Sequence, residues 1–272
     1  MNSKYEISTK ENREFLKASC EELLNFGHRF PSPNGGSYYL GDDGTPWKDR
    51  NRETWITCRM AHVYSLGLML GHEGSGELAD AALKGLKGEL HDEKNGGWYA
   101  GVTPEGDIVP NKQCYAHAFV ILAASSALTA GRPGAKELLE EALAVYDRHF
   151  WNEEEGLACD TWNTEFTVLD DYRGLNANMH TVEAFLAAGD VTGDKKYHIR
   201  AGRIIDHVIQ WAEDNSWRIP EHFTKEWVAD LDCNRDRPDD PFKPYGATPG
   251  HGIEWARLIT QWTLANCEEA KE

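Results

Sequence analysis

The feature that most constrains the fold is a repeat of about 60 residues that alternates two kinds of helix. Gly71, Gly131 and Gly189 follow apolar segments, at spacings of 60 and 58 residues. Glycine in a left-handed conformation commonly ends a helix, so we expect a helix to end at each of these positions. A fixed period of this length is typical of stacked or ring-shaped helical repeats. The sequence therefore predicts a series of helical hairpins.

The two kinds of helix differ in how much of their surface is apolar. A single apolar stripe, typical of a helix covered on one side, occurs in residues 9–26, 75–90, 135–149 and 195–212. In the first of these we expect Phe15, Leu16, Leu23 and Leu24 to be buried. Nearly all sides are apolar in residues 52–70, 175–188 and 250–266 and around Ala116–Ala124. Such helices require cover all round, so the pattern predicts an all-α toroid with striped helices outside and apolar helices inside.

Composition excludes several classes of protein. A chain of 272 residues is long enough for one domain, residues 1–272, and its net charge of −17 argues against nucleic acid and membrane surfaces as partners. No window approaches the ~20 apolar residues of a membrane span, and no secretory signal is visible, so we expect a cytoplasmic protein. The six cysteines lack ligand spacing, which predicts neither a zinc site nor a disulfide framework. The many aromatic side chains could stack on sugar rings.

Long connections precede the apolar helices. They are rich in Gly, Pro, Trp and Asp and span residues 91–111, 150–174 and 213–249. Connections of more than ~15 residues are uncommon in compact domains and usually functional. Because all three enter an apolar helix at its N-terminal end, we expect the chemistry to gather at that end of the toroid.

Polar side chains in the first turns of the apolar helices are the candidate site residues. They are Trp55, Arg59, Tyr115, His117, Asn176, His180, Glu183, His251 and Glu254. The three-residue spacing of His180 and Glu183 recurs in His251 and Glu254. Residues three or four apart share a helix face, so both histidines are expected beside a carboxylate. This recurrence at matching places of a repeat favours one shared site over isolated structural histidines.

This set of side chains suits proton transfer next to a carbonyl group. A histidine held by a carboxylate is a general base that works near neutral pH. Arg59 would stabilise the enediolate that forms between the two proton transfers. Asn176 and Trp55 would bind the hydroxyl groups and the ring face of a sugar. The pattern therefore favours isomerisation or epimerisation of a monosaccharide.

Two other chemistries use similar residues. Carboxylate-bridged metal sites in helices have the order ExxH rather than HxxE, and Arg59 would be a poor neighbour for a cation, so we expect no metal. A glycoside hydrolase needs two carboxylates that flank the scissile bond. The candidates for such a pair are Asp160, Asp170, Asp171 and Glu221, and the sequence does not select among them.

Four segments of the chain resemble a known family. They are PDDPFKPYGATPGHGIEWARL (238–258), GLNANMHTVEAFLAA (174–188), ETWITCRMAHVY (53–64) and CYAHAFVILAASS (114–126). In these the chain resembles the N-acylglucosamine 2-epimerase superfamily. It is more similar to the aldose-ketose isomerase branch, with the mannose and sulfoquinovose isomerases, than to the epimerases. The resemblance extends along nearly the whole chain.

The resemblance implies a fold, a reaction and residue roles. The fold is an (α/α)6 barrel, and the reaction uses neither metal nor cofactor. Arg59 would be the inward arginine, and His251, paired with Glu254, an acid/base. His180 would contact the sugar, which Trp55 and Asn176 would line. The base lifts the C2 proton of an aldose such as mannose or sulfoquinovose, and the cis-enediolate is reprotonated at C1.

One departure from the family leaves alternatives open. The family has a third essential histidine on a late helix, and this chain carries no counterpart. Eight helices make about four of six hairpins, so we expect an incomplete ring at the C-terminal side: either the sequence is a fragment or truncated product, or a partner fills the gap. A homo-oligomer is a further possibility. The alternatives are a sugar 2-epimerase of the same superfamily, a non-catalytic sugar-binding protein and an oligosaccharide hydrolase or lyase.

Overall fold

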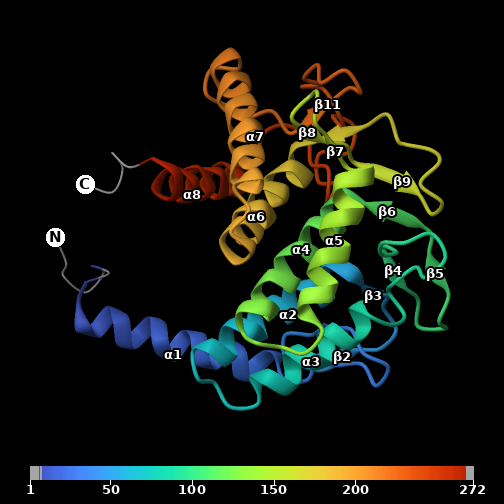
Figure 1. Cartoon of the computed structure of the whole chain (residues 1–272). Coiled ribbons are helices and arrows are strands. Elements are labelled where there is room, and N and C mark those ends of the chain that lie inside the picture. Colours follow the sequence, from blue (N-terminus) through green and yellow to red (C-terminus); the bar gives the residue numbers. More distant parts are fainter. Residues whose placement is uncertain (1–5, 7, 268–272) are drawn as a thin grey trace.

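Eight helices dominate the computed structural model, which describes residue 6 and residues 8–267 (Figure 1). They are α1 (Lys10–Gly27), α2 (Thr54–Met69), α3 (Ser75–Leu86), α4 (Cys114–Thr129), α5 (Ala135–His149), α6 (Leu175–Thr192), α7 (Lys195–Asp214) and α8 (Pro249–Asn266). Each segment predicted to be helical is a helix, with the second striped helix ending earlier than expected. None of the helices within these residues is long and apolar enough to cross a membrane.

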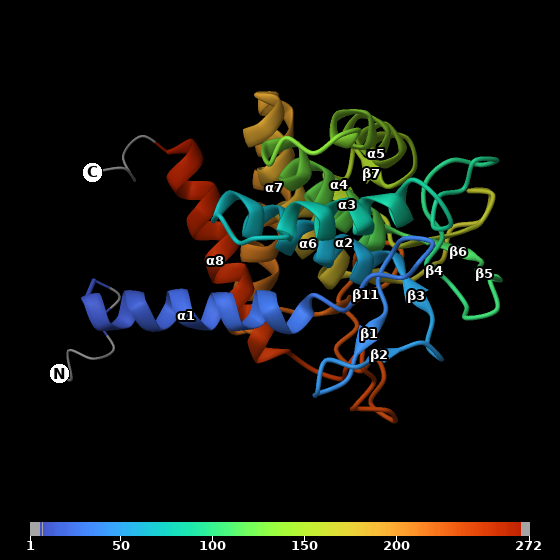
Figure 2. The ribbon, with the colours of Figure 1, turned by 90° about the horizontal axis from the view of Figure 1, so that it is seen from below.

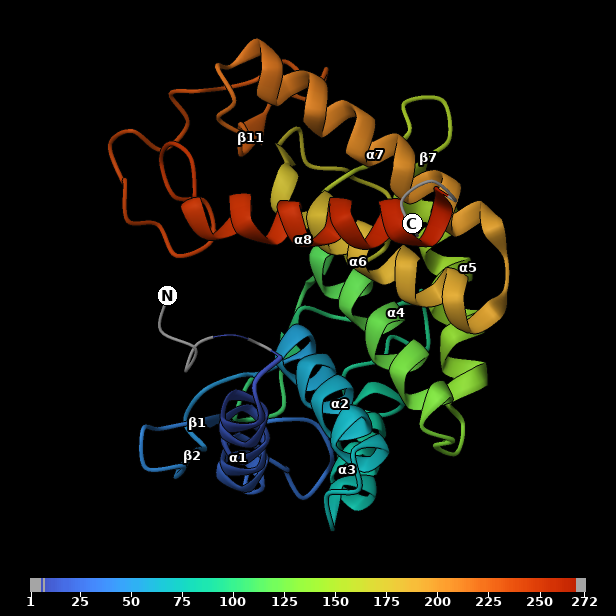
Figure 3. The same ribbon diagram turned by 90° about the vertical axis from the view of Figure 1, so that its left-hand side faces the viewer.

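The helices pack as successive hairpins. α2 packs against both α3 and α4, α4 against α5 and α6, and α6 against α7. Figure 3 shows α2, α4 and α6 following one another in a row, with α1 beyond one end and α8 crossing at the other. α4 and α6 are buried on nearly every side, as their uniformly apolar sequences predict, and they form the centre of the core.

The two ends of the row differ from the prediction. In α1 most of the expected stripe is exposed, with Phe15 at 65% and Leu23 at 71% of full accessibility and Leu16 also exposed, while Leu24 is buried as predicted. α1 is attached near its C-terminal end, where the Tyr64 hydroxyl donates to the Leu24 carbonyl at 2.8 Å. An apolar stripe indicates that packing against a neighbour would stabilise that face of the helix. Within the described residues no helix covers this face of α1.

α2 and α8 are also less enclosed than their sequences predict. Only Trp255 and Leu258 of α8 are buried, and Ile253 is 75% exposed. In α2 the exposed apolar side chains lie toward the C-terminal end and include Leu66 and Met69. Figure 2 shows α1 and α8 on the same side of the molecule, with the other helices beyond them. The expected cover all round is therefore confirmed for α4 and α6 and is wrong for α2 and α8 within the described part of the chain.

Glycines end three of the apolar helices, although not all at the predicted positions. Gly71 and Gly131 follow α2 and α4 with φ of 82° and 68°, as expected. Gly189 instead lies inside α6, which continues to Thr192 and ends at Gly193 with φ of 73°. A Cβ atom at Gly189 would lie 2.1 Å from the His198 ring, so this glycine permits close approach of α6 and α7.

Eleven short strands occupy the connections that precede the apolar helices. They are β1 (Tyr39–Leu40), β2 (Pro46–Trp47), β3 (Arg52–Glu53), β4 (Gly101–Val102), β5 (Ile108–Val109), β6 (Asn111–Gln113), β7 (Trp151–Asn152), β8 (Leu157–Ala158), β9 (Thr161–Asn163), β10 (Arg173–Gly174) and β11 (His222–Phe223). β3, β6 and β10 run directly into α2, α4 and α6. Each pairs antiparallel with a strand of the next connection, β3 with β4, β6 with β9 and β10 with β11.

A buried ion pair anchors the second of these connections. The Lys112 ammonium group donates to Asp92 at 2.9 Å and to the Gly96 carbonyl at 2.8 Å, and neither charged side chain is accessible to solvent. Burial lowers the pKa of Lys112, although the Asp92 carboxylate opposes this effect. Because a buried charge is costly without its partner, the pair holds the connection in one arrangement at the start of α4.

Candidate active site

A cavity of about 370 Å³ lies where the connections meet the N-terminal ends of α2, α4 and α6. Three predicted residues line it: Trp55 on α2, Tyr115 on α4 and Asn176 on α6. The other lining residues are Glu53, Ala100, Val109, Asn111, Gln113, Asp160, Thr161, Asp170, Tyr172, Gly174, Ala177, Phe242 and Lys243. Aromatic rings and hydrogen-bonding groups thus converge on a space large enough for a monosaccharide.

Arg59 lies one turn beyond Trp55 on α2. Its guanidinium group is 5.4 Å from the Trp55 ring centroid and 4.6 Å from that of Phe119. Nη2 donates to the Tyr115 hydroxyl at 3.2 Å. Among the described residues no carboxylate forms an ion pair with Arg59, so its positive charge stays available for an anionic atom of a ligand.

His180 and Glu183 form the ion pair that their spacing predicts. His180 Nδ1 lies 3.1 Å from Glu183 Oε2, and the His180 ring meets the edge of Tyr115 at a centroid distance of 5.1 Å. Arg257 of α8 donates to the other Glu183 oxygen at 2.7 Å. Burial alone would raise the pKa of Glu183, but His180 and Arg257 lower it to about 2. This carboxylate is therefore ionised at neutral pH.

Glu254 belongs to this same cluster. Its carboxylate is 3.8 Å from Arg257, and ligand atoms of His180, Glu183 and Glu254 lie within 4.8 Å of one another. One imidazole and two carboxylates are a ligand set that a divalent cation could use. Arg257 already supplies positive charge to both carboxylates. The geometry therefore suits a compensated ion cluster without requiring a metal.

His251 does not pair with Glu254, and here the predicted partner is wrong. His251 Nδ1 lies 2.9 Å from Oε2 of Glu221, a buried residue in the connection between α7 and α8. The hydrogen bond to Glu221 raises the pKa of His251 above its ordinary value of 6.5, while burial opposes the shift and the charge of Glu254 adds to it. A loop carboxylate thus replaces the expected helical neighbour.

The structure does not bring His117 together with the other predicted residues. Its ring is buried, with Nδ1 2.7 Å from the Gln113 carbonyl and Nε2 accepting from the Trp98 backbone N–H at 3.1 Å. Burial lowers the pKa of His117 to about 3. Both ring nitrogens of this neutral histidine are occupied by backbone groups, so it joins α4 to the preceding connection and has no nitrogen left for a sugar.

Several cavity residues were not selected from the sequence. Asp160 was one of four undistinguished carboxylates, and burial raises its pKa. Lys243 lies 3.6 Å from the Tyr172 ring centroid, and Tyr39 donates to Glu53 at 2.6 Å. These residues come from different connections, and only the folded arrangement of those connections places them around one cavity.

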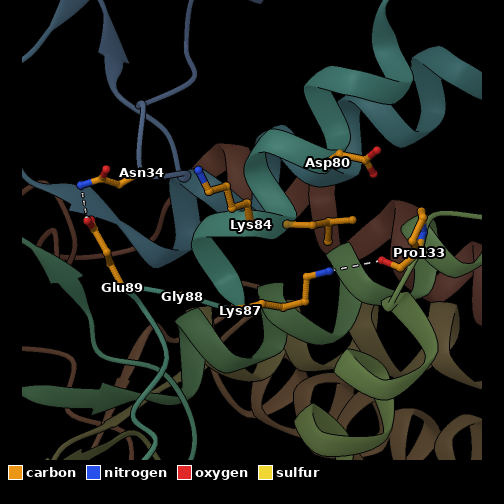
Figure 4. A pocket seen from close by; sticks show the side chains of 8 residues that line it. Asn34, Asp80, Lys84, Lys87, Gly88, Glu89 and Pro133 are labelled. Atoms are coloured by element: carbon orange, nitrogen blue, oxygen red, sulfur yellow. Dashed lines mark hydrogen bonds between the residues drawn. The ribbon is translucent and has the colours of Figure 1, made fainter.

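A second hollow, of about 550 Å³, lies outside this site along α3 (Figure 4). The ammonium groups of Lys84 and Lys87 donate to the carbonyls of Pro33 and Pro133 at 3.0 and 3.2 Å. Asn34 donates to Glu89 at 2.6 Å. Both lysines are therefore occupied by backbone groups on the outer surface, and none of the predicted site residues lines this hollow.

Comparison with known proteins identifies the family. The sequence model of the N-acylglucosamine 2-epimerase (GlcNAc 2-epimerase) family matches residues 35–272. The chain belongs to this family. Among other members, a D-mannose isomerase of Thermobifida fusca is 42% identical over 269 residues, which cover 94% of this chain and 66% of that protein. A D-mannose isomerase of Pseudomonas cannabina pv. alisalensis is 40% identical over 254 residues, covering 93% and 61%.

Solved structures of similar proteins share the epimerase-family fold. A crystal structure of D-mannose isomerase has a TM-score of 0.87 and 29% identity, covering 95% of this chain and 68% of that one. The cellobiose 2-epimerase of Bacillus thermoamylovorans B4167 has a TM-score of 0.80 at 21% identity, covering 95% and 69%, which shows the fold alone. This chain spans 61–66% of the length of the curated relatives it matches, slightly less than two thirds.

Proposed function

We propose that the protein acts in the interconversion of an aldose and a ketose, with D-mannose and D-fructose as the substrate pair. The observation that carries the proposal is a pair of histidine–carboxylate contacts, His180 with Glu183 and His251 with Glu221, at the starts of adjacent helices. Arg59, which no described carboxylate neutralises, lies beside the same aromatic cavity. The names of the similar D-mannose isomerases support this choice of substrate.

The proposed reaction moves one proton between neighbouring carbons. In the open-chain aldose a neutral imidazole takes the C2 proton, and the C–H electrons form the C1–C2 double bond while negative charge develops on O1. The Arg59 guanidinium stabilises that charge. The protonated base exchanges its proton with solvent and donates to C1, and the C2 hydroxyl loses its proton to O1, which gives the ketose with atoms and electrons balanced. We assign the proton transfers to His251 and His180.

The cavity residues supply binding and orientation. Trp55, Tyr115 and Tyr172 present aromatic surfaces suited to the apolar face of a sugar. Asn176 offers both a donor and an acceptor to sugar hydroxyls. We assign Glu183 the role of holding His180, while Glu254 adds negative charge to the same cluster. These assignments leave His117 as a structural residue.

Deuterium labelling tests the proposed reaction and its alternatives together. The protein is incubated with D-mannose in D₂O, and the products are analysed by NMR. Fructose with deuterium at C1 supports isomerisation, and the activity is expected to survive EDTA. Glucose with deuterium at C2 would instead identify a 2-epimerase. Mannose binding without any exchange at C2 would mean a sugar-binding protein and would contradict the proposed isomerisation.

Substitutions test the residue assignments. His251→Ala and Arg59→Ala are each expected to lower kcat by about 10²–10⁴-fold, the usual contribution of a positioned acid/base or electrostatic group. His207→Ala is a matched control, since this histidine lies on the outer helix α7 and its Nε2 contacts the Glu155 carbonyl. Wild-type turnover in His251→Ala would contradict its role as an acid/base.

We also propose that the hairpins form part of an (α/α)6 ring, of which the single domain of this chain supplies about four of six hairpins. The exposed apolar faces of α1, α2 and α8 support this proposal, because a closed ring covers each helix on both sides. A crystal structure of the whole natural protein tests it. Six hairpins around the cavity are expected, and any arrangement that leaves α1 and α8 uncovered would contradict the ring.

A further inference from the structure

Glu221 connects the first turns of the two helices that carry the candidate histidines. Its side chain is only 7% exposed, and both carboxylate oxygens accept hydrogen bonds from the start of α8. Oε1 accepts from the Thr248 backbone N–H at 3.2 Å, and Oε2 lies 2.9 Å from His251 Nδ1. The backbone carbonyl of Glu221 accepts from the Leu175 N–H at 3.0 Å, where α6 begins. One residue thus holds α6, α8 and the His251 ring.

The carboxylate of Glu221 lies at the N-terminus of α8. Thr248 is the N-cap residue of α8, and its own side chain makes no capping hydrogen bond. The N-terminus of a helix carries partial positive charge, which attracts a carboxylate. The Glu221 carboxylate therefore caps α8 and at the same time lies against Nδ1 of His251.

This contact determines which nitrogen of His251 can react. A carboxylate only accepts, so the proton of neutral His251 stays on Nδ1 and the Nε2 lone pair is available as a base. Within the described residues Nε2 has no hydrogen-bond partner. The charges that act on this ring are Glu221, from the connection, and Glu254, one turn farther along α8. Only Glu221 is in hydrogen-bonding contact with the ring.

We propose that Glu221 is the positioning residue for His251: it fixes the tautomer and the ring orientation that leave Nε2 to exchange the substrate proton. Glu254, which the HxxE spacing suggests for this task, acts instead within the cluster of His180, Glu183 and Arg257. The inference rests on the proposed function for the identity of the reaction, and on the geometry alone for the state of the His251 ring.

NMR titration of the histidine rings tests the inference without any substrate. The His251 signal is assigned by its loss in His251→Asn. In Glu221→Gln, which preserves side-chain size, the pKa of His251 is expected to fall and the preference for the Nδ1–H tautomer to weaken. Glu254→Gln is expected to lower the pKa less, because Glu254 acts only through space. An unchanged pKa in Glu221→Gln, or a larger fall in Glu254→Gln, would overturn the proposal.

Kinetics separate positioning from a merely structural role. Glu221→Gln is expected to lower kcat by about 10²-fold, as loss of an oriented base does, and to move the acidic limb of the pH–kcat profile to lower pH. Loss of structure alone would lower the melting temperature and leave that limb in place. The exposed Glu226→Gln is the matched control and should change neither. A wild-type protein without turnover would refute the proposed function, and the titration would still decide the role of Glu221.

Discussion

The helices at the centre and at the ends of the row were all predicted to have covered apolar faces, but their surroundings differ. α4 and α6 are covered by neighbours on nearly every side, whereas α1 and α8 expose large apolar side chains such as Phe15 and Ile253. The apolar pattern of the sequence predicted α1, α4, α6 and α8 equally well as helices. The difference teaches that an apolar face indicates where a helix needs a packing partner. Which element provides that partner depends on the arrangement of the whole fold.

The largest expected difference between the two regions is in the free energy of unfolding when a phenylalanine is truncated. Phe185 of α6 is fully buried and contacts Tyr146, Trp151 and Tyr197. Phe185→Ala is expected to cost about 3–5 kcal/mol, and the matched change Phe15→Ala in α1 less than about 0.5 kcal/mol. Chemical denaturation measures both. Similar costs at the two positions would mean that the face of α1 is covered in solution.

Two glycines, Gly189 inside α6 and Gly193 directly after it, allow a smaller test that compares helix packing with helix ending. Gly189→Ala places a methyl group into the His198 ring and is expected to cost about 1–3 kcal/mol through overpacking. Gly193→Ala forces a side chain onto a left-handed residue with open space around it, at a cost of about 1 kcal/mol. Thermal unfolding ranks the two. A larger loss at Gly193 would contradict the close approach of α6 and α7.

The smallest expected effect concerns the junction between the centre and α8, and it depends on pH. The pKa of Glu183 is lowered on folding, so its stabilising contribution is present above its ordinary value of 4.5 and is lost as the pH falls toward about 2. Hydrogen exchange, corrected for intrinsic rates, is expected to show α8 losing protection relative to α4 between pH 5 and pH 3. Arg257→Ala should weaken this dependence, while His180 still lowers the pKa of Glu183. Equal losses in both helices would contradict it.

Local spacing predicted the parts of the site that are built within one helix. Trp55 with Arg59 and His180 with Glu183 lie three or four residues apart, and both pairs are found as expected because a helix brings such residues onto one face. The helices themselves were predictable for the same reason. Their apolar period is local information, and it was correct for all eight.

Contacts between segments account for what the sequence did not predict. Glu221 precedes His251 by 30 residues, and only the path of the intervening connection brings its carboxylate to the imidazole. His117 lies in the first turn of α4, as the cavity residue Tyr115 does, yet the backbone of the preceding connection occupies both of its nitrogens. Gly189 was misinterpreted because a glycine needed for helix contact and one needed for helix ending look alike in a sequence.

The strand pairs between successive connections limit how this architecture can change length. Each of β3, β6 and β10 forms hydrogen bonds with a strand of the following repeat. Neighbouring repeats are therefore joined by strand pairs just before α2, α4 and α6 begin. A connection can be lengthened between these strand pairs, for example in the turn from β4 to β5, without moving the first turn of a helix. An insertion between one of these strands and the helix that follows it would rotate the helix and turn its site residue away from the cavity. The length of these turns can thus vary, in evolution or by engineering, while the spacing between the first turns of α2, α4 and α6 stays constant.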